Sequence, residues 1–189
     1  MARPLSEEKR EAILEAAAEL VATLGTGAPT ARIAKAAGFA EGTLFTYFAT
    51  KDDLLNQLFL EIEAELAKTL LDAYPSQGNA RERTQYLWDR LIDWGAAHPM
   101  KRKAMRQLKV SDRITEDSRS RAAVLFRDLN SLLEQDLSGH VANDYASTYI
   151  SAILDTLAEA TLEFIAREPG KRAHYKRAGF EIFWKGIAA

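Results

Sequence analysis

The sequence has no cysteine, few prolines and glycines, and no excess of charge of either sign. The absence of cysteine from 189 residues excludes a disulfide scaffold and a cysteine-ligated zinc module. Five prolines and ten glycines are too few for a collagen-like or low-complexity chain. Because 25 Lys and Arg nearly balance 27 Asp and Glu, the net charge is −2, whereas many nucleic-acid binders are strongly basic. Any DNA-binding surface must therefore be local.

Long apolar runs are also missing. No segment approaches the roughly 18 consecutive apolar residues that a membrane-spanning helix needs. The first residues, MARPLSEEKREAI, contain no apolar signal region, so we expect a cytoplasmic protein that makes no membrane contact. Hydrophobic residues nevertheless make up 47% of the chain, which is enough for a folded core and argues against a disordered protein.

Residue types that favour helices dominate the whole length, and no run of alternating β-branched residues predicts a strand. We therefore expect an all-α fold of about nine helices, separated by turn signals. The clearest interruption is residues 74–78, and a long apolar helix is expected from about residue 143 to residue 167. Five helices begin at residues that can cap an amino terminus: Ser6, Thr30, Thr50, Asn79 and Thr115.

Residues 30–55, TARIAKAAGFAEGTLFTYFATKDDLL, contain two short helices joined by a four-residue turn. This arrangement predicts a helix-turn-helix, in which the small Ala34 allows close crossing and Gly38 adopts the left-handed conformation that reverses the chain. The second short helix of such a unit faces outward and fits a DNA major groove. Three apolar residues are expected to fill the space behind it: Phe39, Leu44 and Phe48.

This segment resembles the DNA-binding region of the tetracycline-repressor (TetR) family of bacterial transcription regulators. The matching positions are Thr30, Ile33, Ala34, Ala37, Gly38, Gly42, Thr43, Leu44, Tyr47, Phe48, Lys51 and Leu54. The resemblance implies a three-helix DNA-binding head over residues 1–51 and a larger helical domain for ligand binding and dimerisation over residues 52–189. It also implies a homodimeric repressor that a small-molecule effector releases from a palindromic DNA operator.

Three positions depart from the family pattern. Phe39 replaces the usual valine, which is an exchange of one apolar residue for another. Ala40 replaces a serine, so the recognition helix loses its usual amino-terminal cap, at a cost of about 1 kcal/mol. Phe45 replaces a tyrosine whose hydroxyl can touch a phosphate in relatives. None of these exchanges changes the expected fold. They leave open which residues contact the DNA backbone.

Individual roles follow from position in the motif. Thr30, Tyr47 and Lys51 are expected to contact phosphates. In the major groove, glutamate can accept a hydrogen bond from cytosine, and threonine or phenylalanine can pack on a thymine methyl. Arg32 and Glu41 are equally well explained as plain surface residues, and Glu41 can also repel phosphates and so sharpen selectivity. The predicted DNA-binding set is Thr30, Arg32, Glu41, Gly42, Thr43, Phe45, Thr46, Tyr47 and Lys51.

The helix expected from Lys171 onward indicates a dimer. It carries two glycines seven residues apart among large apolar residues, and a glycine inside a helix costs about 1 kcal/mol relative to alanine. This suggests that another helix comes close, either from a partner subunit or from the same chain. The predicted dimer contacts, taken from the last two helices, are Tyr149, Ile153, Ala178, Gly179, Ile182, Phe183 and Gly186.

An effector site is harder to predict from the sequence, because protein cores and ligand pockets are both lined by apolar residues with a few polar groups. The candidate wall residues are Trp88, Trp94, His98, Met105, Phe126, Tyr149 and Thr156. The sequence predicts no cofactor and no metal. It does not identify the effector.

An enzyme is the main alternative class, and a helical adaptor that binds a small molecule without DNA is another. The chain contains no HExxH, GxSxG, Walker or GxGxxG motif, and its histidines, at positions 98, 140 and 174, are scattered. A basic helix over residues 100–109 fits a solvated face, although it could also attract an anion. We therefore expect a regulator and not an enzyme.

Overall fold

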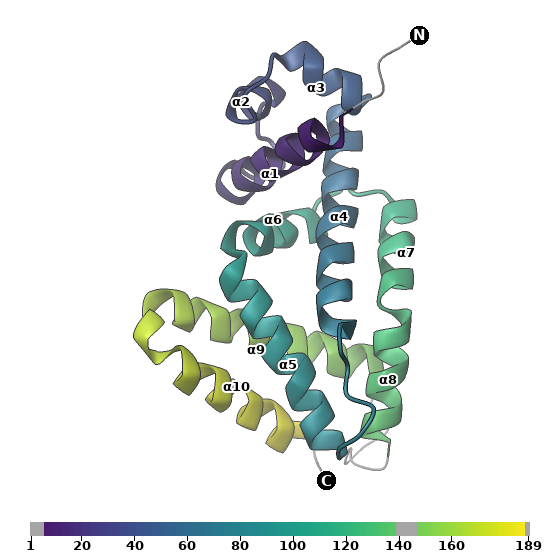
Figure 1. Ribbon diagram of the computed structural model, residues 1–189, viewed down its shortest axis with the longest axis vertical. Coiled ribbons are helices and arrows are strands. Elements are labelled where there is room, and N and C mark those ends of the chain that lie inside the picture. The colour runs from purple at the N-terminus through teal and green to yellow at the C-terminus, as the bar shows by residue number, and fades with distance from the viewer. Residues whose placement is uncertain (1–5, 139–146, 188–189) are drawn as a thin grey trace. The chain divides into compact units, whose positions relative to one another are not determined.

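The computed structural model describes residues 6–138 and 147–187, and its regular structure in these ranges is entirely helical, which confirms the predicted all-α fold (Figure 1). No helix in the described ranges is both long and apolar enough to cross a membrane. The elements are α1 (Glu7–Leu24), α2 (Thr30–Ala36), α3 (Glu41–Tyr47), α4 (Lys51–Leu71), α5 (Ala80–Ala97), α6 (Pro99–Lys109), α7 (Glu116–Leu125), α8 (Arg127–Leu137), α9 (Ser147–Arg167), a 3₁₀ turn η1 (Pro169–Lys171) and α10 (Arg172–Ile187).

The described residues contain one more α-helix than the sequence predicts, because the helix that begins after Thr115 is divided in two. Phe126, between α7 and α8, has φ −97° and ψ 1°, which interrupts helical geometry. The buried Ala122, Leu129 and Leu133 keep helical spacing across this point. The apolar pattern therefore continues through the break, and no glycine or proline marks it.

Side-chain caps form at four of the five predicted helix starts. At α5 the cap is reciprocal, since the Glu82 amide donates to Asn79 Oδ1 and the Asn79 amide donates to Glu82 Oε2, each over 3.0 Å. At α4 the Asp53 amide donates to Thr50 Oγ1 over 3.0 Å. Ser6 and Thr115 cap α1 and α7 in the same way. These short-range hydrogen bonds explain why the starts of these helices could be located from sequence.

The chain divides into two compact units. The first comprises residues 1–64 and 98–123, of which the described part holds α1, α2, α3, α6, the first part of α4 and most of α7. Within it, α1 packs against both α2 and α6. Its fully buried side chains come from α1, α2, α3, α4 and α6: Ile13, Ala17, Val21, Ile33, Ala34, Leu44, Leu54, Leu55, Ala104 and Leu108.

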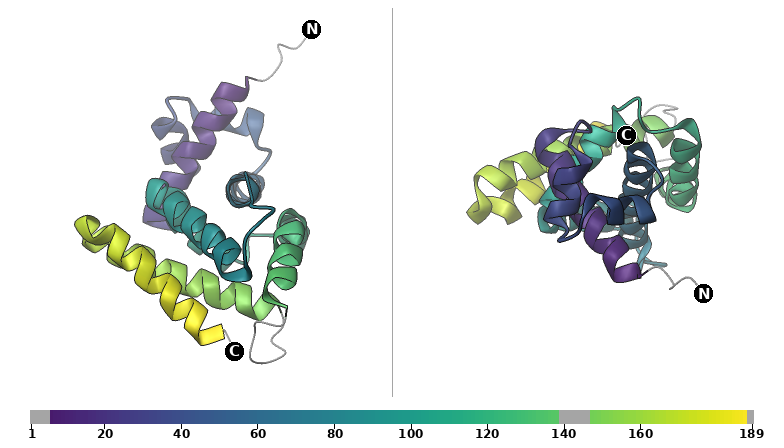
Figure 2. Two further views of the ribbon diagram at one scale, coloured as in Figure 1. Left: turned by 60° about the horizontal axis from the view of Figure 1, so that its bottom comes forward. Right: turned by 90° about the horizontal axis from the view of Figure 1, so that it is seen from above.

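The second unit comprises residues 65–97 and 124–189, and its described part holds α5, α8, α9 and α10. Figure 2 shows α9 and α10, the yellow-green and yellow helices, lying next to each other, and both pack against α5. Trp88 of α5 is fully buried, and its indole Nε1 donates to the backbone oxygen of Lys176 over 2.8 Å. Lys176 Nζ in turn lies 3.0 Å from Asp93, so α10 is held on α5 by a buried ring and an ion pair.

A polar cluster fixes the connection between α4 and α5 inside the second unit. The Tyr74 hydroxyl donates to Asp136, a buried carboxylate of α8, and Arg83 Nη2 lies 2.5 Å from the same carboxylate. Burial and the neighbouring carboxylate raise the pKa of Tyr74 well above its ordinary value. The predicted interruption at residues 74–78 is therefore an anchored turn, because its first residue is hydrogen-bonded to α8.

Gly179 of α10 packs closely against both α9 and α5 of the same unit. A Cβ atom placed there would lie 2.4 Å from Thr161 Oγ1 of α9 and 2.6 Å from an atom of the Trp88 ring. The sequence correctly indicated a close approach at this glycine, but the neighbours belong to the same chain. Phe183 is also buried, at 1% exposure. Gly179 and Phe183 are thus buried within their own chain, and their assignment to a dimer interface stays a prediction.

We expect Gly179→Ala to lower the free energy of unfolding by about 1–3 kcal/mol, because the added methyl group overpacks against Thr161 and Trp88. Gly186→Ala is the matched control in the same helix, since a Cβ atom added there would meet no atom within 4 Å, and it should be neutral or slightly stabilising. Urea unfolding of both variants measures the difference. Equal unfolding midpoints would contradict the packing described here.

Candidate nucleic-acid interface

The helix-turn-helix predicted from sequence is present in the first unit. α2 ends at Ala36 and α3 begins at Glu41, so four residues form the turn. Gly38 has φ +82°, the left-handed conformation that glycine adopts without steric cost. The Phe39 amide donates to the backbone oxygen of Ala34 over 2.8 Å and closes the turn. The angle between α2 and α3 is thereby fixed by the backbone.

One face of α3 is buried and the opposite face is open. Leu44, and Phe48 directly after the end of α3, are at most 1% exposed, so they anchor α3 in the core of the unit. Phe39, which the sequence placed beside them, is only half-buried, and Lys9 Nζ lies 5.6 Å from its ring centroid. Gly42, Phe45 and Thr46 are exposed and share one side of the helix, because they are three and four residues apart.

Thr30 and Glu41 connect the starts of the two short helices. The Thr30 hydroxyl donates to Glu41 Oε1 over 2.6 Å. Thr30 is the first residue of α2, and its predecessor Pro29 occupies the cap position without a side-chain hydrogen bond. The prediction that Thr30 caps α2 is therefore wrong, because its hydroxyl bonds to Glu41 instead. α3 likewise starts at Ala40 without a side-chain cap, as the sequence indicated.

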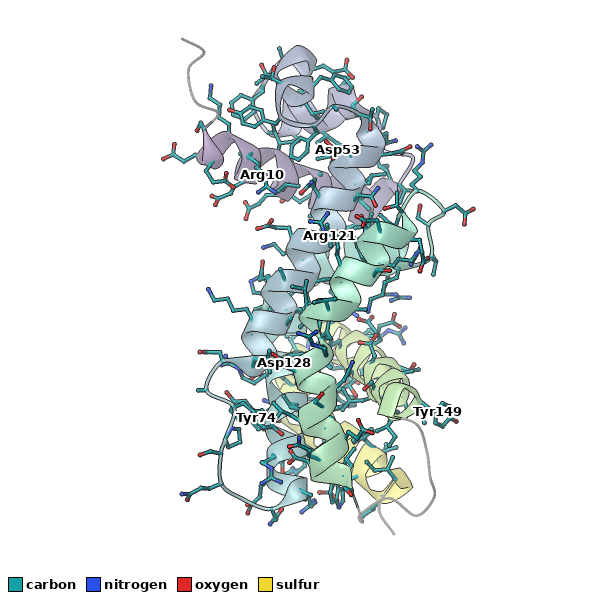
Figure 3. The ribbon with its side chains drawn as sticks, turned by 90° about the vertical axis from the view of Figure 1, so that its right-hand side faces the viewer. Arg10, Asp53, Tyr74, Arg121, Asp128 and Tyr149 are labelled. Carbon is teal, nitrogen blue, oxygen red and sulfur yellow. The ribbon has the colours of Figure 1, made fainter. Side chains whose placement is uncertain are left out.

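Two of the predicted phosphate contacts follow the open face of α3 in the sequence. The Tyr47 hydroxyl accepts a hydrogen bond from the Ser6 amide over 3.1 Å, which ties the end of α3 to the start of α1. A hydroxyl that accepts one hydrogen bond still has a proton to donate. Lys51 is the first residue of α4, directly after the capping Thr50 and two residues before Asp53, which Figure 3 labels. Both side chains are half-buried and keep part of their surface in contact with solvent.

Arg113 is a charged neighbour of this region that sequence reasoning missed. Its Nη1 atom lies 2.6 Å from Asp52 of α4. The segment that carries it is held by Asn56, whose Nδ2 donates to the Arg113 backbone oxygen over 2.9 Å. Partial burial and the Arg113 charge lower the pKa of Lys51, while Asp52 opposes this shift. No local pattern relates residue 113 to residue 52, so only the fold reveals this pair.

The remaining predicted DNA-binding residues are Arg32, which is exposed on α2, and Thr43, which is half-buried on α3. Five of the predicted DNA-binding residues are thus exposed on the surface of the unit: Arg32, Glu41, Gly42, Phe45 and Thr46. Exposure alone does not test whether they contact DNA. Their assignment stays a prediction.

The predicted effector-site residues are not brought together in one unit. His98 and Met105 belong to the first unit, and the other candidates belong to the second. Trp94 is buried and its Nε1 donates to Glu65 over 2.9 Å, while Phe126 is half-buried. Trp88 fills the core between α5 and α10. Thr156 is exposed and its hydroxyl donates to the backbone oxygen of Ala152, so it does not line the interior of its unit.

The predicted dimer contacts other than Gly179 and Phe183 lie at least partly on the surface. Tyr149 is 54% exposed and projects from the first turn of α9 (Figure 3), and Ile182 of α10 is 62% exposed. Gly186 is exposed, while Ile153 and Ala178 are half-buried. These five positions are compatible with a subunit contact, which stays a prediction.

Comparison with known proteins identifies the helix-turn-helix segment. Residues 13–58 match the sequence model of a family described as bacterial regulatory proteins, tetR family. A curated relative, the fatty acid metabolism regulator protein of Bacillus subtilis, is 33% identical over 72 residues. That match covers 38% of this chain and 37% of the relative, so it spans little more than a third of either protein.

Solved structures match over nearly the whole length. A protein from Shewanella sp. PV-4, assigned to the tetR family of transcription regulators, is 28% identical, with a TM-score of 0.83 over 96% of this chain and 98% of that one. The transcriptional regulator FadR from Bacillus subtilis, crystallised in complex with stearoyl-CoA, is 19% identical. It has a TM-score of 0.72 over 94% of this chain and 99% of its own, and at this identity it supports the fold alone.

We expect Tyr47→Phe to release the start of α1, because the Ser6 amide then loses its acceptor. The loss of one part-buried hydrogen bond should reduce stability by about 1 kcal/mol and speed hydrogen exchange at the Ser6 amide. The Phe48 amide, which donates to the Leu44 oxygen, serves as an internal control and should exchange as before. Unchanged exchange at Ser6 would show that this hydrogen bond does not hold α1.

Proposed function

We propose that the chain is a member of the tetR family of bacterial regulatory proteins and a sequence-specific DNA-binding transcription regulator, on the basis of the helix-turn-helix match over residues 13–58 and the likeness to solved regulators. We propose further that it is a homodimeric repressor, not an enzyme, and that a small-molecule effector releases it from a palindromic operator in the cytoplasm. The single observation that carries the proposal is the open face of α3, formed by Gly42, Phe45 and Thr46 and held outward by a buried Leu44.

The arrangement of the head supports insertion of α3 into a major groove. In helix-turn-helix proteins the second helix lies in the groove while flanking groups hold the phosphates. Tyr47 and Lys51, which follow the open face directly in sequence, are suited to the phosphate contacts. Thr30 fits this role only if its hydroxyl leaves Glu41, to which it is hydrogen-bonded.

The charge of the head argues for two copies acting together. Between residues 1 and 51, the six basic and six acidic side chains cancel. Nonspecific attraction to DNA depends on neutralising phosphates, so a head without net charge binds weakly by itself. Two linked heads gain affinity through their effective concentration, and a two-fold dimer requires an operator of matching symmetry.

The exposed apolar side chains of the second unit supply a surface for such a dimer. Tyr149 and Phe164 of α9 and Ile182 of α10 are 54%, 48% and 62% exposed. Large apolar side chains exposed on helices that already bury their other side are typical of protein–protein contacts. A contact between two copies of this surface would be isologous, as a two-fold dimer requires.

The effector is proposed by chemical class. FadR of Bacillus subtilis was crystallised with stearoyl-CoA, and the curated relative regulates fatty acid metabolism. We propose a long-chain acyl thioester as the effector of this chain. Such a ligand would release DNA only by binding more tightly to the conformation that does not fit the operator.

Gly42→Ala should separate folding from DNA binding. Gly42 lies in helical conformation with open space around it, so alanine should stabilise α3 by up to about 1 kcal/mol. The added methyl group on the outward face should weaken DNA binding about tenfold or more, which corresponds to roughly 1.4 kcal/mol. Gel-shift titration against a duplex selected from a random library measures the affinity, and thermal unfolding measures the stability.

Gly170→Ala is the control for this experiment, because it adds a methyl group in equally open space in the second unit. It should leave DNA affinity unchanged. If the folded wild-type protein enriches no duplex, or if Gly42→Ala binds the selected duplex as well as the wild type, the proposed role of α3 is wrong.

Stearoyl-CoA should raise the melting temperature of the protein, because a ligand that binds the native state stabilises it by an amount that grows with the logarithm of the ligand concentration. The same ligand should dissociate the selected DNA duplex, whereas free coenzyme A at equal concentration should do neither. Differential scanning fluorimetry and gel shift provide the two measurements. A rise in melting temperature without release of DNA would contradict its role as the releasing effector.

A further inference from the structure

The recognition helix lacks the side chains that most often read bases by hydrogen bonding. Residues 41–47, EGTLFTY, include no arginine, lysine, asparagine or glutamine. Arginine and lysine read guanine, and asparagine and glutamine read adenine, through paired donors and acceptors in the major groove. The helix must therefore distinguish sequences in another way, if the proposed function holds.

Two polar side chains of α3, Glu41 and Thr46, are hydrogen-bonded within the head. The Thr46 hydroxyl donates to the backbone oxygen of Gly42 over 3.0 Å, and the Glu41 carboxylate accepts the Thr30 hydroxyl over 2.6 Å. Threonine hydroxyls in helices commonly make such bonds to the preceding turn. This bond uses the hydroxyl proton of Thr46 internally and leaves its methyl group as the apolar part of the side chain.

The rest of the open face is apolar. Phe45 is 43% exposed, although large aromatic side chains are usually buried. Gly42 lies three residues before it and Thr46 one residue after it, so a phenyl ring and a methyl group border a position without a side chain. The missing side chain allows close approach of the backbone to a ligand.

The thymine C5-methyl is the apolar group that a standard base pair presents in the major groove. We propose that α3 selects its operator mainly through thymine methyl groups, with Phe45 and the Thr46 methyl as the specificity-determining groups. This inference rests on the proposed function and adds the chemistry of recognition to it. 5-Methylcytosine carries the same methyl group on a different base pair, so methyl recognition and hydrogen-bond recognition can be separated experimentally.

The test uses the full-length protein and the duplex selected from a random library. Each thymine of a half-site is replaced in turn by deoxyuridine, which removes only the methyl group. At one or more positions affinity should fall about fourfold, as expected for one buried methyl-sized group. At those positions a 5-methylcytosine·guanine pair should bind more tightly than a cytosine·guanine pair. Equal affinity for thymine and deoxyuridine at every position would overturn the inference.

Two substitutions at one position separate the methyl group from the hydroxyl. Thr46→Val keeps a methyl group and removes the hydroxyl, so it should retain the discrimination between thymine and deoxyuridine. Thr46→Ser keeps the hydroxyl and removes the methyl group, so it should lose the discrimination at one position. The reverse result would show that the hydroxyl reads the base. Phe45→Ala should abolish discrimination at the other methyl-sensitive position.

Circular dichroism and thermal unfolding establish that each variant is folded before its DNA affinity is interpreted. Both altered side chains are exposed, so we expect unfolding midpoints close to that of the wild type. Selection of a duplex that is then insensitive to deoxyuridine overturns this inference but not the proposed function. Failure to select any duplex overturns both.

Discussion

The position of α3 depends on a short turn and two buried side chains. The left-handed Gly38 reverses the chain after α2, while Leu44 and Phe48 hold α3 in the core of the first unit. A helix of seven residues is too short to be stable alone, because nucleation costs more than its few hydrogen bonds return. Its conformation and orientation are therefore supplied by packing, and the residues on its other side are free of any structural task. Gly42 and the exposed Phe45 therefore need not contribute to the packing that holds α3.

The features that sequence analysis predicted correctly depend on short-range chemistry. The caps at Ser6, Thr50, Asn79 and Thr115 join residues three apart, and the conformation of Gly38 follows from the four-residue turn. The features it missed depend on partners distant in sequence. The Arg113–Asp52 ion pair and the Thr30–Glu41 hydrogen bond arise only when separate segments are folded together. The break at Phe126 was missed for a different reason, since the apolar spacing continues unchanged across it.

Gly179 shows the limit of inference from a residue type. A glycine inside a helix between large apolar residues does signal that something packs closely, and here Trp88 and Thr161 do so. The signal carries no information about which chain the neighbour belongs to. Gly186, seven residues later, has open space around it, although the sequence pattern treats the two glycines alike. A dimer contact on α10 must therefore be argued from exposed side chains such as Ile182, and not from the glycines.

The apolar chemistry of the open face determines how much of the DNA affinity of such a regulator depends on the base sequence. A head without net charge gains little from phosphates, so few of its contacts are independent of sequence. Methyl contacts contribute modestly each, but they cost little to desolvate and leave no buried donor unpaired when they are made. A mismatched base then removes a favourable contact but leaves no buried polar group unpaired. The loss of binding free energy per mismatch at one half-site is therefore small. Sharp selection of an operator would require both heads of a dimer to be satisfied at once, and this makes the subunit contact part of the recognition mechanism.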